Sequence, residues 1–156
     1  MTKYPLLRVG DLRARALDAA MTRLAGFVKL YEDARRARAA AEARRLEHDR
    51  TAEQIRSNER EVMASGALRA SDLAQARAWD MRAAFEAARL EAFVQRAREG
   101  ESTASKAHTD AQAQVGARRA DARVIERDRA RWESARRCAA EAKEEEALSE
   151  SWRRRG

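Results

Sequence analysis

The sequence predicts an all-α protein that folds as a long antiparallel two-helix coiled-coil hairpin. Of its 156 residues, 38% are charged and 5% are aromatic, so little is available to fill a thick globular core. Alanine, arginine and glutamate, which all favour helices, dominate the composition. The apolar residues recur at the spacings of a coiled-coil seam, the line along which two helices pack. We expect a single coiled-coil domain over residues 1–156.

Disorder and β-structure are the two alternatives to this fold. Disordered chains are rich in proline, glycine and serine, whereas this chain has one proline and six glycines. No stretch of about five β-branched or aromatic residues alternates with polar ones, so the sequence contains no candidate strand.

The first helix is expected over residues 6–62. Its clearest heptad run steps by four, three, four and three residues through Leu17, Met21, Leu24, Val28 and Tyr31. Further along, the apolar positions shift register, and we interpret this drift as a stutter in the middle of the helix. The shifted positions are Leu30, Ala34, Ala37 and Ala41, followed by His48, Thr51, Ile55, Asn58 and Val62.

A turn is expected over residues 63–71, before a second helix over residues 72–152. Gly66 suits a left-handed helix cap, and Ser71 or Asp72 suits the start of the next helix. The seam residues expected in the second helix are Trp79, Ala83, Leu90, Phe93 and Ala97, then Ala104, His108, Ala111, Val115, Ala122, Ile125, Trp132 and Ala139.

Gly100 leaves one alternative open for the second helix. A glycine costs a helix about 1 kcal/mol, so the helix would bend there and continue. A break at Gly100 would instead give a three-helix bundle.

The sequence offers no catalytic or metal-binding constellation. Neither His48 nor His108 has a second histidine or a cysteine at a helical spacing that completes a metal site. Cys138 is the only cysteine, so no internal disulfide forms. There is no glycine-rich phosphate loop or nucleophile elbow. The sequence therefore predicts a protein that is not an enzyme and needs no cofactor or small-molecule substrate.

The net charge is +7, and the basic residues are almost all arginine. This balance permits acidic partners of three kinds: nucleic acid, an anionic membrane surface or an acidic protein face. A nucleic-acid-binding coiled coil is one alternative, although acids interleave with the arginines along both helices. A scaffold coiled coil that dimerises is another, because exposed seams also pair between chains. No apolar stretch approaches the roughly 20 residues that span a bilayer, and no signal-peptide region is evident, which together predict a cytoplasmic protein.

Several features together resemble the type III secretion central-stalk family (YscO/FliJ). These are the Lys3–Leu6 opening, the passage through Leu12 and Arg13 into a long helix, the Met63–Gly66 turn, and an arginine-rich second helix. The resemblance implies an antiparallel stalk whose open end, with both termini, enters the pore of a hexameric secretion ATPase. Its tip would face the cytoplasmic ring of the export gate, and secretion chaperones would be further partners. It places the protein at the cytoplasmic face of the secretion apparatus, in contact with the membrane only through that apparatus.

The resemblance also implies two sets of contact residues. Of these, Tyr4, with Pro5 and Leu6 beside it, matches the family pattern directly, and the others follow from their position on the hairpin. The candidates for ATPase binding are Tyr4, Leu7, Leu12, Trp132 and Trp152. The candidates for export-gate binding are Ile55, Met63, Trp79 and Met81.

Overall fold

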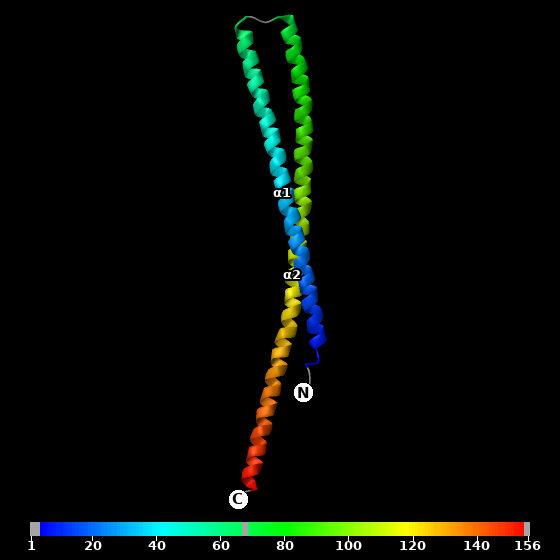
Figure 1. The fold of residues 1–156 in the computed structure, drawn as a ribbon, viewed down its shortest axis with the longest axis vertical. Coiled ribbons are helices and arrows are strands. Elements are labelled where there is room, and N and C mark those ends of the chain that lie inside the picture. The colour runs from blue at the N-terminus through cyan, green and yellow to red at the C-terminus, as the bar shows by residue number, and fades with distance from the viewer. Residues whose placement is uncertain (1–3, 67–68, 155–156) are drawn as a thin grey trace. The chain divides into compact units, whose positions relative to one another are not determined.

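A computed structural model of the chain describes residues 4–66 and 69–154 and contains two helices, α1 (Leu7–Ala64) and α2 (Ala70–Arg153) (Figure 1). The described residues include no strand. The helices pack together and run in opposite directions, which confirms the prediction of an all-α helical hairpin. Because α2 continues through Gly100, the alternative of a break at this glycine is wrong.

The ends of the helices follow from short-range hydrogen bonds. Gly66 has a φ of 73°, so it forms the expected left-handed cap after α1, where its N–H donates to the Met63 carbonyl at 3.2 Å. The prediction placed the start of α2 at Ser71 or Asp72, whereas the helix begins earlier, at Ala70. The Asp72 carboxylate instead accepts the N–H of Arg69 at 2.9 Å from within the first turn. Residues 67–68 of the predicted turn lie outside the described residues.

The hairpin comprises two compact units. Unit 1 contains Met1–Ala25 and Asp110–Gly156, and unit 2 contains Gly26–Thr109. In both units the seam is narrow: the buried apolar residues are Tyr4, Ala20, Ala52, Ala83, Val94, Ala111 and Val115. Small side chains bury little area, so each turn of helix adds only modest stability.

In unit 1, the seam of α1 passes through Ala20 and not through Met21. Ala20 is 9% exposed, whereas Met21 is 45% exposed, so the prediction for Met21 is wrong. Gly10 lies in the same seam, where a Cβ atom would meet Ile125 Cγ2 at 3.3 Å. The glycine therefore permits a close approach of the two helices.

In unit 2, α1 keeps one register. A continuous line of half-buried and buried positions steps alternately by four and three residues through Phe27, Tyr31, Ala34, Arg38, Ala41, Arg45, His48, Ala52 and Ile55. The stutter predicted in α1 is therefore wrong, and Leu30, which would have begun its second register, is 57% exposed.

The register shift of unit 2 lies in α2. Leu90 follows Ala83 in the seam after one heptad. The next seam residue is Val94, four residues further on, whereas a step of three residues would have placed Phe93 in the seam. Val94 is 3% exposed and Phe93 is 47% exposed, so the predicted seam position of Phe93 is wrong. The shift turns the largest side chain of this stretch outward.

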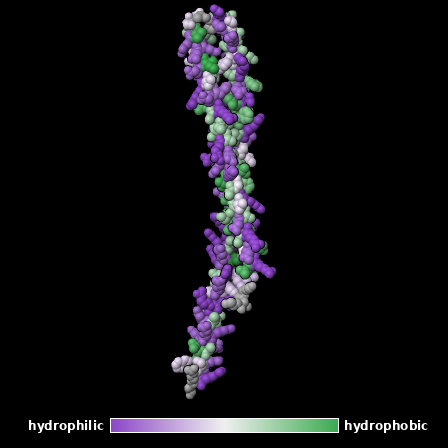
Figure 2. Space-filling model, in the orientation of Figure 1, coloured by the Kyte–Doolittle hydropathy of each residue, from purple (hydrophilic) through white to green (hydrophobic). Residues whose placement is uncertain are grey.

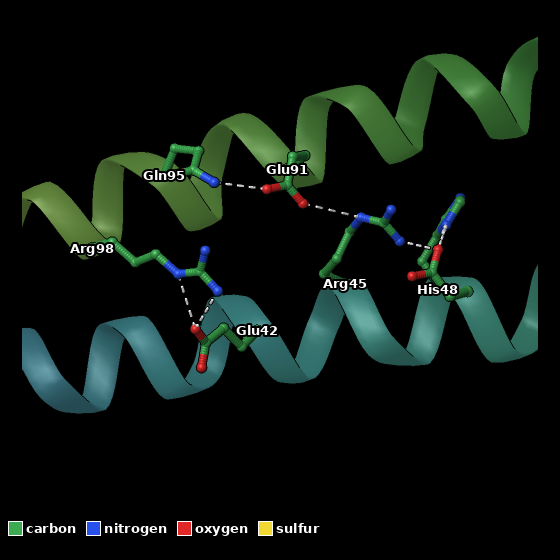
Figure 3. A network of polar contacts seen from close by, with 7 residues as sticks. Glu42, Arg45, His48, Glu91, Gln95 and Arg98 are labelled. Carbon is green, nitrogen blue, oxygen red and sulfur yellow. Dashed lines mark hydrogen bonds and ion pairs between the residues drawn. The ribbon is translucent and has the colours of Figure 1, made fainter.

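Charged side chains reach across the seam in unit 2 (Figure 3). Arg98 pairs with Glu42 at 3.0 Å and Arg45 Nε with Glu91 at 3.6 Å, while Gln95 donates to the same glutamate at 2.8 Å. Arg38 and Arg56 pair across the seam with Glu101 at 2.9 Å and with Asp80 at 3.5 Å. Each such pair is worth only about 0–1 kcal/mol at partly exposed sites. Together they favour one antiparallel register over its neighbours.

Candidate protein-docking surfaces

Most of the surface is polar. Figure 2 shows hydrophilic side chains over most of the visible face, with hydrophobic side chains gathered in small groups. Among residues 4–66 and 69–154, no three histidine, cysteine, aspartate or glutamate side chains come together as metal ligands, and no helix is long and apolar enough to cross a membrane. The candidate sites are therefore the apolar side chains that the hairpin leaves exposed.

Tyr4 and Trp132 pack on each other in unit 1. Their ring centroids are 5.5 Å apart in an edge-to-face arrangement, and the Tyr4 hydroxyl donates to Asp128 at 2.5 Å. Burial, and then this hydrogen bond, raise the pKa of Tyr4 to about 12. The Arg136 guanidinium lies 4.9 Å from the Trp132 ring. Tyr4 is 8% exposed, so these two predicted contact residues cover each other and hold Tyr4 against α2.

The other three residues predicted to bind an ATPase are accessible. Leu7, Leu12 and Trp152 are 41%, 64% and 78% exposed. Leu7 lines a hollow of about 160 Å³ beside Gly10 and Ile125. Every residue of α2 from 133 to 150 is exposed, including Leu148, so this part of the helix has no covering element in unit 1.

The four residues predicted to bind an export gate have different surroundings in unit 2. Ile55 is half-buried and lines a hollow of about 250 Å³ with Met63, which is 44% exposed. Trp79 is half-buried in the seam. Met81 is 75% exposed on the side of α2 away from that hollow. The structure therefore brings Ile55 and Met63 together and leaves Met81 on a separate surface.

Met81 belongs to a second apolar stripe on α2, which we call the outer stripe. An α-helix turns by about 100° per residue, so residues spaced alternately by four and three share one face. The outer stripe faces roughly opposite to Ala83 and Leu90 in the seam. Its members, all exposed, are Ala74, Ala78, Met81, Phe85, Ala88 and Ala92. Phe85 is 72% exposed and was missed by the sequence analysis, although the second heptad run is visible in the sequence.

Arginines flank the outer stripe. Helical geometry places Arg77 on one side of the stripe and Arg82, Arg89 and Arg96 on the other, all exposed. Two nearby acids, Asp80 and Glu91, instead pair with arginines of α1. The stripe therefore has an apolar centre with basic margins, which suits an amphipathic helix with acidic margins.

The fold and these surfaces define the chain as a coiled-coil hairpin with exposed apolar faces. Comparison with known protein families, characterised proteins and solved structures found no match.

Proposed function

We propose that this protein is a docking hairpin without chemistry of its own, and that it acts as the central stalk of a type III secretion export apparatus. The observation that carries the proposal is the outer stripe, because α2 presents one apolar face to α1 and a second to solvent. The alanines of this stripe favour the helix itself, whereas the exposed Met81 and Phe85 side chains add little to a monomeric hairpin and suit a protein that binds another helix. The resemblance of the Tyr4–Leu6 opening to the stalk family supplies the particular assignment.

In this proposal the two units have separate partners. The outer stripe of unit 2, centred on Met81 and Phe85, contacts the cytoplasmic ring of the export gate. In unit 1, Leu7, Leu12 and the uncovered part of α2 that ends at Trp152 contact the hexameric secretion ATPase. Tyr4 and Trp132 serve that contact indirectly, because their ring contact holds the segment from Tyr4 to Leu7 close to α2.

The mechanism follows from the kind of contacts that the hairpin offers. Exposed arginines on two paired helices make many weak ion pairs and offer no deep pocket, so a ring binds the hairpin without one fixed register. The stalk then couples nucleotide-dependent asymmetry of the ATPase ring to the gate. Secretion chaperones that have delivered their cargo are a further partner in this proposal.

Binding to purified partners tests the proposal. The chain is mixed with the hexameric ATPase and with the cytoplasmic domain of the gate from the same source, and binding and ATP hydrolysis are measured. We expect Met81→Glu/Phe85→Glu to abolish gate binding and to leave ATPase binding intact. Deletion of residues 148–156 should have the opposite effect. Leu30→Glu/Leu46→Glu, which alters two exposed leucines of α1, is the matched control. Failure of the wild-type chain to bind either partner would refute the stalk assignment.

A further inference from the structure

A groove with basic margins lies between the two helices of unit 2. It has a volume of about 680 Å³, and its apolar lining includes Ala37, Ala40 and Ala41 from α1 and Phe93 from α2. The groove exists because Val94 and not Phe93 lies in the seam, while the apolar residues that α1 contributes to the lining are all alanines. Small side chains leave space that neither helix fills.

The margins of this groove carry three arginines and one glutamate. Arg44 comes from α1, and Arg89, Arg96 and Glu86 come from α2. The guanidinium groups of Arg89 and Arg96 lie 5.9 and 5.8 Å from the centre of the Phe93 ring. The groove thus combines an apolar floor with an excess of positive charge, which favours an apolar side chain flanked by carboxylates.

The same chain contains a segment of that description. Residues 141–150 carry five glutamates and one lysine, a net charge of −4, and all of them are exposed. Glu144, Leu148 and Trp152 are spaced by four residues, so they share one face of α2. Leu148 and Trp152 are 61% and 78% exposed.

We propose that two copies of this chain associate by placing the acidic segment of one copy, residues 141–152, in the arginine-margined groove of the other. Leu148 or Trp152 covers the alanine floor and Phe93, while Glu144 and Glu145 face Arg44 and Arg96. The inference rests on these two surfaces and not on the proposed stalk function. It makes self-association sensitive to salt, because the ion pairs form at exposed margins.

Charge reversal on each side tests the pairing. Self-association of the full chain is measured by sedimentation equilibrium over a wide range of protein concentrations, at low salt and at about 1 M NaCl, where the Debye length is about 3 Å. We expect reversible association at low salt that high salt weakens. Arg44→Glu/Arg96→Glu and Glu144→Lys/Glu145→Lys should each weaken it by about tenfold or more.

A mixture of the two variants supplies the decisive result. The acidic groove of one variant then meets the basic segment of the other, so association should return in the mixture. Arg119→Glu/Arg123→Glu makes the same charge change at exposed positions of α2 outside both the groove and the outer stripe, and it should leave association unchanged. Circular dichroism and thermal unfolding establish that each variant keeps its helices.

Three results would overturn the proposal. They are a wild-type chain that stays monomeric at every concentration and at low salt, association that survives both charge-reversal variants, and a mixture that fails to associate. Loss of association through Met81→Glu/Phe85→Glu, with both groove variants unaffected, would assign the contact to the outer stripe instead.

Discussion

The Tyr4 hydroxyl donates a hydrogen bond of 2.5 Å to Asp128 Oδ2, joining residues that are 124 positions apart. One helical turn further along α2, Trp132 packs its ring against the same tyrosine. A single side chain thus makes a polar and an aromatic contact with α2, and it does so from outside the regular heptad seam. The contact fixes Tyr4, which lies three residues before α1, on α2 within unit 1.

This contact predicts a pH dependence of stability. The folded pKa of Tyr4 is about 12, above its ordinary value of 10.0, so folding favours the protonated hydroxyl. Its contribution is complete below about pH 10 and is lost as the pH rises towards about 12. We expect the free energy of unfolding of the wild type, measured with urea, to fall more steeply over this range than that of Tyr4→Phe.

The control for this pH effect is Tyr31→Phe, because Tyr31 stacks on His108 and does not take part in the Asp128 contact. Its pH profile should follow the wild type. Coincident profiles for the wild type and Tyr4→Phe would show that the hydrogen bond does not contribute.

The register shift in α2 predicts unequal effects at two neighbouring positions. Val94 is 3% exposed in the seam and Phe93 is 47% exposed, so Val94→Ala should cost about 1–2 kcal/mol of unfolding free energy. Phe93→Ala should cost about 0.5 kcal/mol or less, as is usual at exposed sites. Chemical denaturation of both variants measures the two costs. If Phe93 and not Val94 lay in the seam, Phe93→Ala would be the more destabilising of the two.

Two glycines in helices should respond differently to substitution. A Cβ at Gly100 would meet no atom within 4 Å, so Gly100→Ala should stabilise the protein by about 0.5–1 kcal/mol through its helix propensity. At Gly10 a Cβ would already lie 3.3 Å from Ile125 Cγ2. Gly10→Leu should therefore lower the midpoint of thermal unfolding, while Gly100→Ala should raise it. A destabilising Gly100→Ala would indicate that α2 does not run straight through this position.

The Arg38–Glu101 pair predicts an energetic coupling across the seam. Arg38 Nε lies 2.9 Å from Glu101 Oε2, and the glutamate side chain is 15% exposed. Arg38→Glu places two carboxylates together and should destabilise the protein by about 1 kcal/mol or more. Arg38→Glu/Glu101→Arg should recover part of that loss. A double-mutant cycle with no coupling energy would show that the pair plays no part in selecting the register.

The sequence predicted the helices well because composition and periodicity are local properties. It predicted the seam less well where two apolar residues are adjacent. In each of the pairs Ala20–Met21 and Phe93–Val94, either residue fits a helical spacing. Only the partner helix decides which of the two side chains is covered. Larger residues were favoured in the prediction, whereas close packing of the two helices selected the smaller ones.

For the candidate sites, too, the sequence predicted local features, whereas the contacts depended on how the two helices pack. Met81 and Trp152, which are candidate contact residues by the resemblance, are both exposed, but the sequence did not reveal that Phe85 extends the surface around Met81. Nor did it reveal that Tyr4 and Trp132 cover each other, because a contact between residues so far apart depends on the register of the hairpin.

By itself, the sequence determined that this chain forms two long helices with a glycine-capped turn, because helix propensity, the near absence of proline and heptad spacing act over a few residues at a time. The tertiary structure decided which face of each helix is covered, where the register shifts in α2, and which arginines pair across the seam. These depend on how two surfaces fit together, since an apolar residue is buried only when another helix lies over it. The outer stripe and the groove at Phe93 are the surfaces that this fit leaves open.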